Sequence, residues 1–302
     1  MKHYKKQVEI VNKLLSNFIE TYFENEMVKE MVSHAIYGGK RLRSIIPLLI
    51  CEKLNDKISV DKFSISIELF HTCSLIIDDM PCMDNDKTRR GLPTIHEKYG
   101  ETKAQILVTL LLQKATQLLL ENLQEIKDLN IYDNEKMELI FDNVYKSFTD
   151  NLGLLGASMG QYIDCGPGNL FIDNKELTND YSSEKALLQL LHLKTTTFFE
   201  ISFVGSYLIC GGDIKNIVEL KKAVRYFGLA FQLSDDFEDV EQDSAKNKDK
   251  LFNPNLVCRY GKEHIKKLYF ESFEKFSSII NNLKLNHIIY TEIITYLNKR
   301  IK

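Results

Sequence analysis

Residues 220–241, LKKAVRYFGLAFQLSDDFEDVE, carry the pattern that decides the fold. Their apolar side chains recur three or four positions apart, as they do along one face of an α-helix. These residues are Leu220, Ala223, Val224, Phe227 and Phe231, and the same spacing recurs at Val32, Ala35, Ile36, Ile65, Leu69 and Phe70. Alternating runs of β-branched residues between tight turns, which would indicate strands, are hard to find. The sequence therefore predicts an almost wholly α-helical chain.

The helical segments are expected to belong to one domain. The 302 residues include only 14 glycines and 5 prolines, so helix-breaking residues gather in few places. Breaks are predicted at 37–39, 78–93, 130–134, 165–183, 211–212 and 243–255, which separate about ten helices. The segment 186–210 is apolar on more than one face, as is typical of a helix at the centre of a bundle. We expect a large single-domain helical bundle over residues 1–302.

Composition and charge argue against some classes of function. The chain is 44% hydrophobic and 27% charged, and its formal net charge is -3. A nucleic-acid-binding protein carries a basic excess on one face, so no nucleic-acid partner is expected. The six cysteines lack the C-x-x-C spacing of a zinc or redox site. We expect reduced cysteines that act as small core residues in an intracellular protein.

Two features bear on the cellular location. The N-terminal residues 1–15 resemble an amphipathic helix rather than a secretory signal. The longest strongly apolar segment, 106–120, contains Gln113, Lys114 and Gln117, so it is judged too short and too polar to span a bilayer. We therefore expect no transmembrane segment and a cytoplasmic location.

The helix at 220–241 ends in an acidic cluster. Gln232, Asp235, Asp236 and Asp239 fall at i, i+3, i+4 and i+7, so they share one helix face. That face continues the apolar stripe, where carboxylates are costly unless a cation or a polar partner satisfies them. An exposed acidic face is the alternative, but polar residues would then lie opposite the stripe. The pattern favours a face that binds metal.

A second acidic cluster follows the apolar helix predicted at 63–77. Residues 75–91 read LIIDDMPCMDNDKTRRG and contain Asp78, Asp79, Asp84, Asp86, Arg89 and Arg90. Mg²⁺ takes one or two carboxylates together with substrate phosphates, and guanidinium groups bind diphosphate oxygens bidentately. Taken alone, the segment could be a solvated acidic turn. Two such clusters after apolar helices instead indicate one site with metal ions between them.

Three further segments carry polar residues that suit an anion. YGGKRLRS at 37–44 places Lys40, Arg41 and Arg43 at a predicted helix start, where amide N–H groups and the helix dipole favour negative charge. LKTTTFF at 193–199 places Lys194 and Thr195 in apolar surroundings, where a lysine needs an anion or must lose its charge. MGQYIDC at 159–165 contributes Gln161 and Asp164, for which a hydrogen bond between helices is an equal alternative.

Together these motifs resemble the trans-prenyl (isoprenyl) diphosphate synthases of the farnesyl and geranylgeranyl type. The resemblance runs from Gly38 to about Val240, and the motifs occur in the family's order. It implies an all-α fold around a central cavity, usually in a homodimer. It also implies about three Mg²⁺ ions, held on an allylic diphosphate by aspartate motifs that face each other across the cavity mouth. The expected reaction joins that diphosphate to isopentenyl diphosphate, head to tail.

The resemblance assigns roles to single residues. The expected metal ligands are Asp78, Asp79, Asp84, Asp235, Asp236 and Asp239. Arg89 is expected on the allylic diphosphate, and Lys194, Thr195 and Gln232 near that diphosphate or the developing cation. The expected pocket for isopentenyl diphosphate consists of Lys40, Arg43, His71 and Arg90. The expected catalytic set is Asp78, Asp79, Arg89, Lys194, Thr195, Gln232 and Asp235.

The implied chemistry is mainly electrostatic. Mg²⁺, lysine and arginine neutralise the charge that grows on the leaving diphosphate in a site that excludes water. The double bond of isopentenyl diphosphate attacks the allylic cation, and a proton is then lost, with the departing diphosphate as the family's expected base. Aromatic faces and the backbone carbonyl near Lys194 are expected to shield the cation.

Two positions depart from the family's pattern. Relatives carry a stretch of G-K-x-x-G-K-D type after the second motif, whereas residues 243–255 read DSAKNKDKLFNPN and lack the glycines. Lys248, followed by Asp249, is the best match for the lysine that contacts diphosphate. Ile77 stands where many relatives have a histidine. Neither change removes a predicted metal ligand.

The helix before Asp78 limits product length in this family. Positions 73 and 74 are Cys and Ser, where relatives that stop at fifteen carbons carry a bulky aromatic residue. These small side chains open the tunnel by about one turn, roughly 5.4 Å, down to Phe70. We therefore expect geranylgeranyl diphosphate, with twenty carbons. Farnesyl diphosphate is the alternative, because residues of the segment 106–120 also line the tunnel in relatives.

Two other classes of protein share features with the chain. A non-catalytic regulatory subunit of a heteromeric synthase usually lacks aspartates of one motif, and all six are present here. A terpene cyclase shares the helical fold and the Mg²⁺ chemistry. Cyclases, however, lack a second aspartate motif of this form and a pocket like that of Lys40, Arg43 and His71. The sequence therefore favours the synthase over both.

Overall fold

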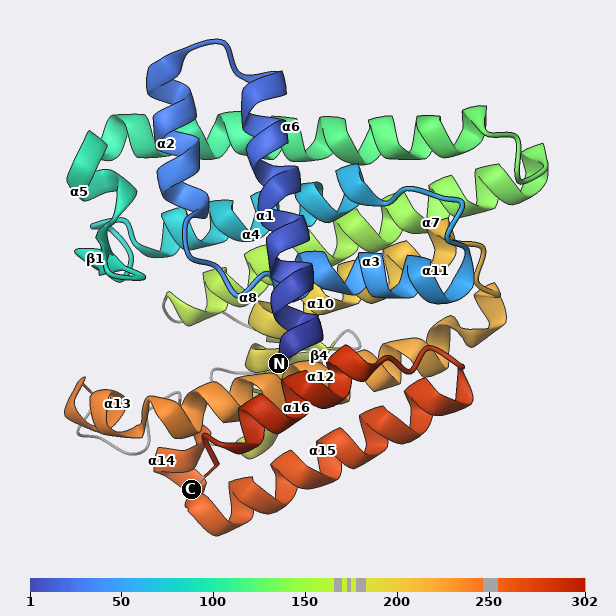
Figure 1. The fold of residues 1–302 in the computed structure, drawn as a ribbon. Helices are drawn as coiled ribbons and strands as arrows, with labels where there is room; N and C mark the ends of the chain where they lie inside the picture. Colours follow the sequence, from blue (N-terminus) through green and yellow to red (C-terminus); the bar gives the residue numbers. More distant parts are fainter. Residues whose placement is uncertain (166–169, 173–174, 178–182, 247–254, 302) are drawn as a thin grey trace.

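The chain folds into a bundle of helices (Figure 1). The structure is a computed structural model, and it describes all residues except 166–169, 173–174, 178–182, 247–254 and 302. The α-helices are α1 (Lys2–Tyr22), α2 (Glu26–Ile36), α3 (Leu42–Leu54), α4 (Asp61–Asp78), α5 (Ile95–Tyr99), α6 (Glu101–Asp128), α7 (Asn134–Leu152), α8 (Ala157–Asp164), α9 (Glu184–Leu191), α10 (Thr197–Glu200), α11 (Ser206–Ile209), α12 (Ile217–Glu238), α13 (Val240–Lys246), α14 (Leu256–Tyr260), α15 (Lys262–Asn282) and α16 (Ile288–Asn298). Two π-helical segments, η1 (His192–Thr196) and η2 (Ile201–Gly205), and one 3-10 turn, η3 (Ile214–Asn216), join them. The predicted all-α fold class is confirmed.

Two short hairpins lie between the helices. Strand β1 (Thr88–Arg89) pairs antiparallel with β2 (Leu92–Pro93), and β3 (Leu170–Ile172) pairs antiparallel with β4 (Lys175–Leu177). Both hairpins fall in segments that the sequence predicts as breaks between helices. The sequence did not predict the strands themselves, since two- and three-residue strands are too short to show alternation.

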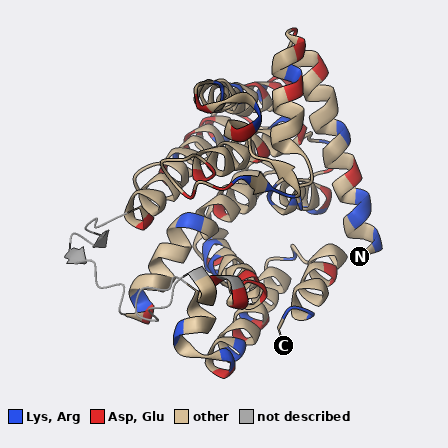
Figure 2. Cartoon of the chain, turned by 90° about the vertical axis from the view of Figure 1, so that its left-hand side faces the viewer, with Lys and Arg blue, Asp and Glu red and all other residues tan. Residues whose placement is uncertain are grey.

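The helices form two groups; α1 crosses the first, and its N-terminal end reaches α16 of the second (Figure 1). In the first group α4 packs along α6 and against α3, and in the second α12 packs along α15. The stretch from η1 to α11 lies between the groups, since η2 contacts α3 and α7 on one side and α12 on the other. Basic and acidic positions are interspersed along the helices of both groups (Figure 2), in keeping with the balanced charge of the chain.

The apolar stripe of α12 is buried, as its spacing predicts. The exposed fraction is 0% for Leu220, Ala223, Val224 and Phe227, and 6% for Phe231. The Phe227 ring centroid lies 5.0 Å from that of Phe199 and 4.9 Å from that of Phe276, so the stripe joins the central stretch to α15. Burial of each such ring stabilises the fold by about 1.5–3 kcal/mol. This packing fixes the orientation of the next turns of α12, which carry the acidic cluster.

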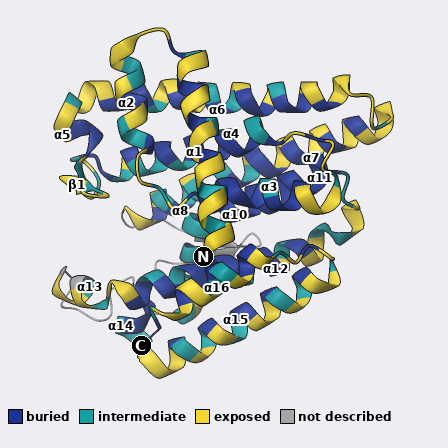
Figure 3. Cartoon of the chain, in the orientation of Figure 1, coloured by how far each residue is buried: buried dark blue, intermediate teal, exposed yellow. Residues whose placement is uncertain are grey.

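The stretch that the sequence places at the centre of the bundle is buried without interruption from 196 to 210 (Figure 3). It is not one regular α-helix, because η1 and η2 each take the wider π-helical form. Hydroxyl groups bond back to the preceding turn; the Oγ1 of Thr197 donates to the carbonyl oxygen of Leu193 at 2.6 Å. Single-turn π-helical segments are frequent at functional sites, and η1 carries Lys194 and Thr195.

The prediction of core cysteines is correct for Cys51, Cys73 and Cys210, which are buried. It is wrong for Cys82 and Cys165, which are exposed. Cys82 lies in the loop after α4 and Cys165 directly follows α8, so neither belongs to the packed part of a helix.

Helix α6 extends well beyond the apolar segment 106–120. It spans 28 residues and is, among the described helices, the one long and apolar enough to cross a membrane by length and composition. Within its most apolar window, 39% is buried inside the molecule. The predicted segment 106–120 is thus part of a longer helix, and length and composition alone do not show that this helix spans a membrane, since core helices of other proteins pass the same test.

Candidate active site

The first acidic cluster lies where α4 ends. Asp78 is the last residue of α4 and Asp79 is its C-cap. The loop then folds back, because the backbone N–H of Asp84 donates to the carbonyl oxygen of Asp78 at 3.0 Å. Asp79 is buried, Asp78 is half-buried and Asp84 is exposed. The turn thus brings the backbone of Asp84 back to that of Asp78.

The β1–β2 hairpin returns Arg89 to this cluster. The Nε of Arg89 donates to the Oδ1 of Asp79 at 2.7 Å, and its Nη2 lies 2.5 Å from the same oxygen. Arg89 also lies 3.7 Å from Asp86. Burial raises the pKa of Asp79, while the hydrogen bonds from Arg89 act to lower it. Arg89 is therefore held at the first motif by a charge-assisted contact.

Lys194 faces the same cluster from η1. Its Nζ donates to the Oδ2 of Asp164 on α8. Burial acts to lower the pKa of Lys194, but the charges of Asp164, Asp78 and Asp84 outweigh it and raise the pKa. Burial likewise raises the pKa of Asp78 to about 6, with Lys194 opposing the shift. The contact with Asp164 is an interhelical hydrogen bond, which the sequence analysis gave as the alternative to a role in anion binding. Gln161 lies nearby and lines an apolar cavity.

Residue 195 connects η1 to the second acidic cluster. The Oγ1 of Thr195 donates to the Oε1 of Gln232 at 2.9 Å, and the Nε2 of Gln232 donates to the Oδ1 of Asp236 at 3.1 Å. The other oxygen of Asp236 accepts from the backbone N–H of Leu256 at 3.0 Å. Asp236 is 6% exposed, and burial raises its pKa to about 7. Three predicted residues of the second half of the site therefore form one hydrogen-bonded chain.

Asp235 points toward basic residues from other elements. Its Oδ1 lies 2.5 Å from the Nη1 of Arg300 and 3.5 Å from the Nζ of Lys40. Arg300 also pairs with Glu238 at 3.0 Å. Asp239 is exposed, at the C-cap of α12. The sequence did not predict a role for Arg300, because nothing in its local pattern near the chain end distinguishes it from a surface arginine.

A basic cavity of about 330 Å³ lies between α3, α4, the β1–β2 hairpin and α12. The predicted site residues that line it are Lys40, Arg43, His71, Arg89, Arg90, Thr195, Gln232 and Asp235. The guanidinium of Arg43 lies over the ring of Phe199, 4.5 Å from its centroid, and 3.4 Å from the Nε2 of His71. Burial lowers the pKa of Arg43 to about 10, and burial with the surrounding arginines lowers the pKa of His71 well below its usual value. His71 is therefore neutral and can accept a hydrogen bond from Arg43.

An apolar cavity of about 470 Å³ begins at the first acidic cluster. Asp78, Lys194 and Gln161 form its polar part. Its apolar walls come from α4, α6, α7, α8 and α10, with lining residues that include Phe70, Cys73, Ser74, Ile77, Leu112, Leu152 and Phe198. Phe70, Cys73 and Ser74, the positions that the sequence linked to product length, thus all line this apolar cavity. The ring of Phe70 packs edge-on against Phe148 of α7, with 4.5 Å between centroids.

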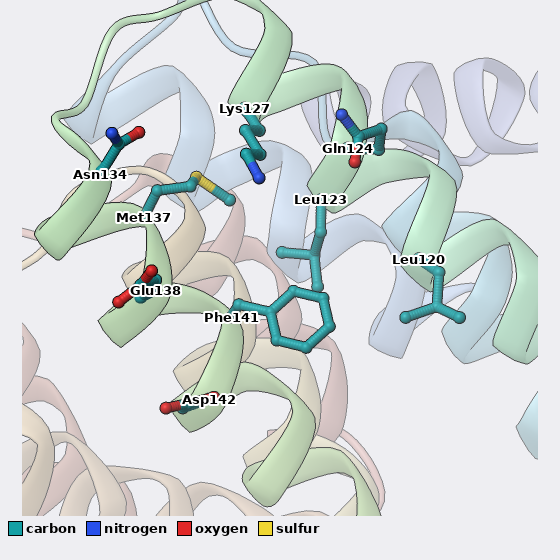
Figure 4. A pocket seen from close by; sticks show the side chains of 9 residues that line it. All are labelled: Leu120, Leu123, Gln124, Lys127, Asn134, Met137, Glu138, Phe141 and Asp142. Carbon is teal, nitrogen blue, oxygen red and sulfur yellow. The ribbon is translucent and has the colours of Figure 1, made fainter.

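Another hollow, of about 480 Å³, lies away from these residues, between the end of α6 and the beginning of α7 (Figure 4). Its lining residues include Leu120, Lys127, Glu138 and Phe141, and none of the predicted site residues that the structure describes. It lacks the combination of several basic groups with an adjacent apolar space. We therefore assign the candidate active site to the basic and apolar cavities.

Two predictions of the sequence, the metal ligands and Lys248, stay predictions. Within the described residues, no three His, Cys, Asp or Glu side chains are close enough together to hold a metal ion by themselves. Lys248, the proposed diphosphate lysine, lies outside the described residues. The sequence also missed a buried ion pair in the wall of the basic cavity, between Arg41 and Glu68 at 2.6 Å. A signal for it existed, since Glu68 is a single charge within the apolar run of α4.

Comparison with known proteins gives consistent matches. Residues 25–253 match the sequence model of the polyprenyl synthetase family. The heterodimeric geranylgeranyl pyrophosphate synthase large subunit 1, chloroplastic, of Arabidopsis thaliana is 31% identical over 254 residues, which are 83% of this chain and 64% of that relative. The chain thus spans just under two thirds of the length of that relative.

Two further matches cover almost the whole chain. The farnesyl diphosphate synthase of Buchnera aphidicola is 30% identical over 302 residues, 97% of this chain and 96% of the relative. The crystal structure of geranyltransferase from Legionella pneumophila has a TM-score of 0.78 at 21% sequence identity, and the match covers 99% of this chain and 96% of that one. At this identity the structural match establishes the fold.

Proposed function

The chain belongs to the polyprenyl synthetase family, and we propose that it is a Mg²⁺-dependent synthase that joins an allylic diphosphate to isopentenyl diphosphate. The observation that carries this proposal is the meeting of two cavities at consecutive residues. Thr195 lines the basic cavity and Lys194 lines the apolar one. A substrate with a charged head and a hydrocarbon tail fits the apolar cavity, with its diphosphate between Asp78 and Lys194. The basic cavity then receives the second diphosphate.

The charge of the basic cavity suits isopentenyl diphosphate. Its lining includes five cationic side chains and the two carboxylates of Glu68 and Asp235. The excess of positive charge, in a space lined partly by aromatic rings, favours a compact polyanion over a neutral ligand. Arg43 and Arg90 supply planar donor groups that match phosphate oxygens.

The carboxylates present fit Mg²⁺. Asp78 and Asp84 on the first cluster and Asp235 on the second would hold the ions, since carboxylate oxygens are the ligands that Mg²⁺ prefers. The raised pKa of Asp78 indicates a carboxylate that buries its charge without enough positive partners, which a cation would supply. Because Mg²⁺ normally takes only one or two carboxylates plus phosphate oxygens, the dispersed arrangement of the two clusters suits ions shared with a diphosphate. The expected number of about three Mg²⁺ ions comes from the family resemblance.

Different side chains of the protein would act in different steps of the reaction. Bound Mg²⁺ would supply electrostatic stabilisation of the leaving diphosphate. Arg89 and Lys194 would bind the diphosphate as its bond to the allylic carbon breaks and the electron pair leaves with oxygen. Lys40 and Arg43 would hold isopentenyl diphosphate so that its double bond reaches that carbon. The apolar walls would exclude water from the cation before the proton is lost to the departing diphosphate.

The apolar cavity favours a twenty-carbon product. Cys73 and Ser74 are small residues on the face of α4 that lines it, and Phe70 lies about one turn deeper. At that depth the rings of Phe70 and Phe148 pack against each other, so two aromatic rings rather than one close the cavity. The names of the relatives include both geranylgeranyl and farnesyl synthases, so they leave the product length open. We propose geranylgeranyl diphosphate, with farnesyl diphosphate as the alternative.

An exposed apolar face supports a homodimer. Exposed positions of α6 between 105 and 120 carry no charge, and Ile106, Leu110 and Leu120 are 55%, 37% and 40% exposed. Leu120 and Phe141 of α7 border the same hollow, which the charged side chains of Lys127, Glu138 and Asp142 also line (Figure 4). An apolar surface of this kind is typical of a protein interface. We propose that a second copy of the chain covers it; the cytoplasmic location remains a prediction.

The proposal is tested by incubating the protein with labelled isopentenyl diphosphate and an allylic diphosphate of five, ten or fifteen carbons. Each incubation is run with Mg²⁺ and with a chelator, and the dephosphorylated products are sized. A Mg²⁺-dependent twenty-carbon product would support both parts of the proposal. A fifteen-carbon end product would support the proposed reaction and contradict the inference that Cys73 and Ser74 leave room for twenty carbons. No elongation from any of the three would favour the non-catalytic subunit instead.

A further inference from the structure

A buried ion pair forms part of the wall of the basic cavity. Arg41 is 5% exposed and Glu68 is 2% exposed, and the Nη1 of Arg41 donates to the Oε1 of Glu68 at 2.6 Å. The second oxygen of Glu68 accepts from the Oγ of Ser44 at 2.5 Å. The Nε of Arg41 donates to the Oδ1 of Asn12 on α1 at 2.9 Å, and its Nη2 donates to the carbonyl oxygen of Ile36. Both charged groups therefore use their polar atoms on protein partners.

The pair determines the path of the backbone between α2 and α3. Arg41 adopts left-handed angles, with φ 58° and ψ 16°, which a residue with a Cβ rarely takes without a compensating contact. Its side chain turns inward and fills the space beside Gly39; a Cβ at Gly39 would lie 2.5 Å from the Nη1 of Arg41. The turn around this buried guanidinium sets where the neighbouring residues project.

Those neighbouring residues belong to the basic cavity. Lys40 reaches Asp235 at 3.5 Å, and Arg43 reaches the Nε2 of His71 at 3.4 Å. They thus approach the cavity from the two sides of Arg41 in the sequence. If Arg41 left its buried position, the left-handed turn would lose its support, and the alignment of both cations would change with it.

Glu68 also balances the charge of the cavity. It lies on α4, three residues before His71, and lines the cavity itself. Its negative charge acts to raise the pKa of Arg43 and of Arg90, against the effect of burial on each. Without Glu68, the cationic groups would repel one another, and Asp235 would be the one carboxylate left in the lining among the described residues.

We propose that Glu68 is a positioning residue for isopentenyl diphosphate, which acts by holding Arg41 in the interior so that Lys40 and Arg43 converge on the diphosphate. This inference rests on the proposed function, since it takes isopentenyl diphosphate as the ligand of the basic cavity. Glu68 makes no contact with the reacting carbon atoms in this role. Its effect is confined to one of the two substrates, because the allylic diphosphate lies at Asp78 and Lys194.

The test compares Glu68→Gln with wild type in two measurements. One is the affinity for isopentenyl diphosphate by calorimetry, and the other is steady-state kinetics with each substrate varied in turn. E68Q is expected to weaken binding and to raise KM for isopentenyl diphosphate by about tenfold or more, with KM for the allylic diphosphate within about twofold of wild type. The matched control is Glu200→Gln, which removes a buried carboxylate (4% exposed) paired with Lys221 at 2.5 Å, outside both cavities.

A purely structural role gives a different pattern. E68Q and E200Q would then both lower Tm, and folded E68Q would bind isopentenyl diphosphate within twofold of wild type, which overturns the inference. If E68Q does not fold, Ser44→Ala decides, because it keeps both charges and removes the hydrogen bond that orients Glu68. A several-fold rise in KM for isopentenyl diphosphate alone supports the inference, and an unchanged KM overturns it. Wild type that neither binds nor elongates isopentenyl diphosphate would instead contradict the proposed function.

Discussion

Asp78 stands where the apolar wall of α4 ends and the charged loop begins. We expect Asp78→Asn to lower kcat by about 10²–10³-fold, because it removes a metal ligand whose charge stabilises the transition state. The matched control is Asp86→Asn in the same loop, since Asp86 is outside the predicted ligand set and its contact with Arg89 is long, at 3.7 Å. Initial rates at saturating substrates and Mg²⁺ measure both variants. A D78N enzyme as active as D86N would contradict the assignment of Asp78.

His192 precedes Lys194 in η1 and makes the stability of the fold depend on pH. Its Nδ1 is buried and has no hydrogen-bond partner among the residues that the structure describes, and burial, together with the charge of Arg225, lowers the pKa of the ring from 6.5 to about 4. Between these values the unfolded chain binds a proton that the folded chain does not, so stability falls as the pH falls from about 6.5 to 4. The full shift corresponds to about 3 kcal/mol, and partial exposure of the ring reduces the expected effect to about 1–2 kcal/mol.

The measurement is the free energy of unfolding by urea at several pH values between 7 and 4. His192→Gln is expected to lose about 1–2 kcal/mol less than wild type across this window. Comparison with wild type cancels the contribution of other titrating groups. Parallel curves for the two proteins would show that His192 does not titrate as its surroundings indicate.

At the residue scale, site residues that belong to a local sequence motif could be predicted better than residues that meet only in the folded structure. The aspartates, Arg89 and Lys194 could be found because their spacing and apolar surroundings are visible locally. Arg300 could not, since its contact with Asp235 depends on how the last helix returns across the second group. Glu68 lies between these cases, because a single charge in an apolar helix indicates a buried partner without identifying it.

At the scale of elements, the predicted breaks at 37–39, 130–134 and 211–212 coincide with ends of helices. Missed breaks lie at 23–25 and 55–60, where the turns are made without a glycine or proline. Asn25 begins α2 by accepting a hydrogen bond from the backbone N–H of Val28, a cap that a local count of helix breakers overlooks. The π-helical segments η1 and η2 were also missed, because each is a single turn of five residues within a longer helical run.

Helix α4 is predicted to set the product length through the face that bears Phe70 and Cys73. Phe70→Ala should extend the product beyond twenty carbons, because it opens the cavity toward Phe148. Cys73→Phe should shorten the product to fifteen carbons, because it closes the cavity about one turn earlier. Chromatographic sizing of the dephosphorylated products measures both, with circular dichroism to verify folding. Identical products from the two variants would show that α4 is not the limiting wall.

At the scale of the whole molecule, the face of α6 and α7 is expected to join two copies. Wild type should elute with the mass of two 35.0 kDa chains in light scattering, and Ile106→Glu should shift it toward one, since a buried charge disfavours the interface. The control is Met27→Glu on α2, at a side chain that is 49% exposed on another element. A wild-type monomer, or dissociation by M27E as readily as by I106E, would contradict the interface.

The central claim is that one site uses two diphosphates in a single Mg²⁺-dependent reaction. The most direct measurement is the rate of diphosphate release with geranyl diphosphate, isopentenyl diphosphate and Mg²⁺ supplied together and with each omitted in turn. We predict release only when all three are present, with one diphosphate released for each carbon–carbon bond formed. Release from geranyl diphosphate alone would indicate a cyclase or a hydrolase, and no release under any condition would contradict catalysis by this chain.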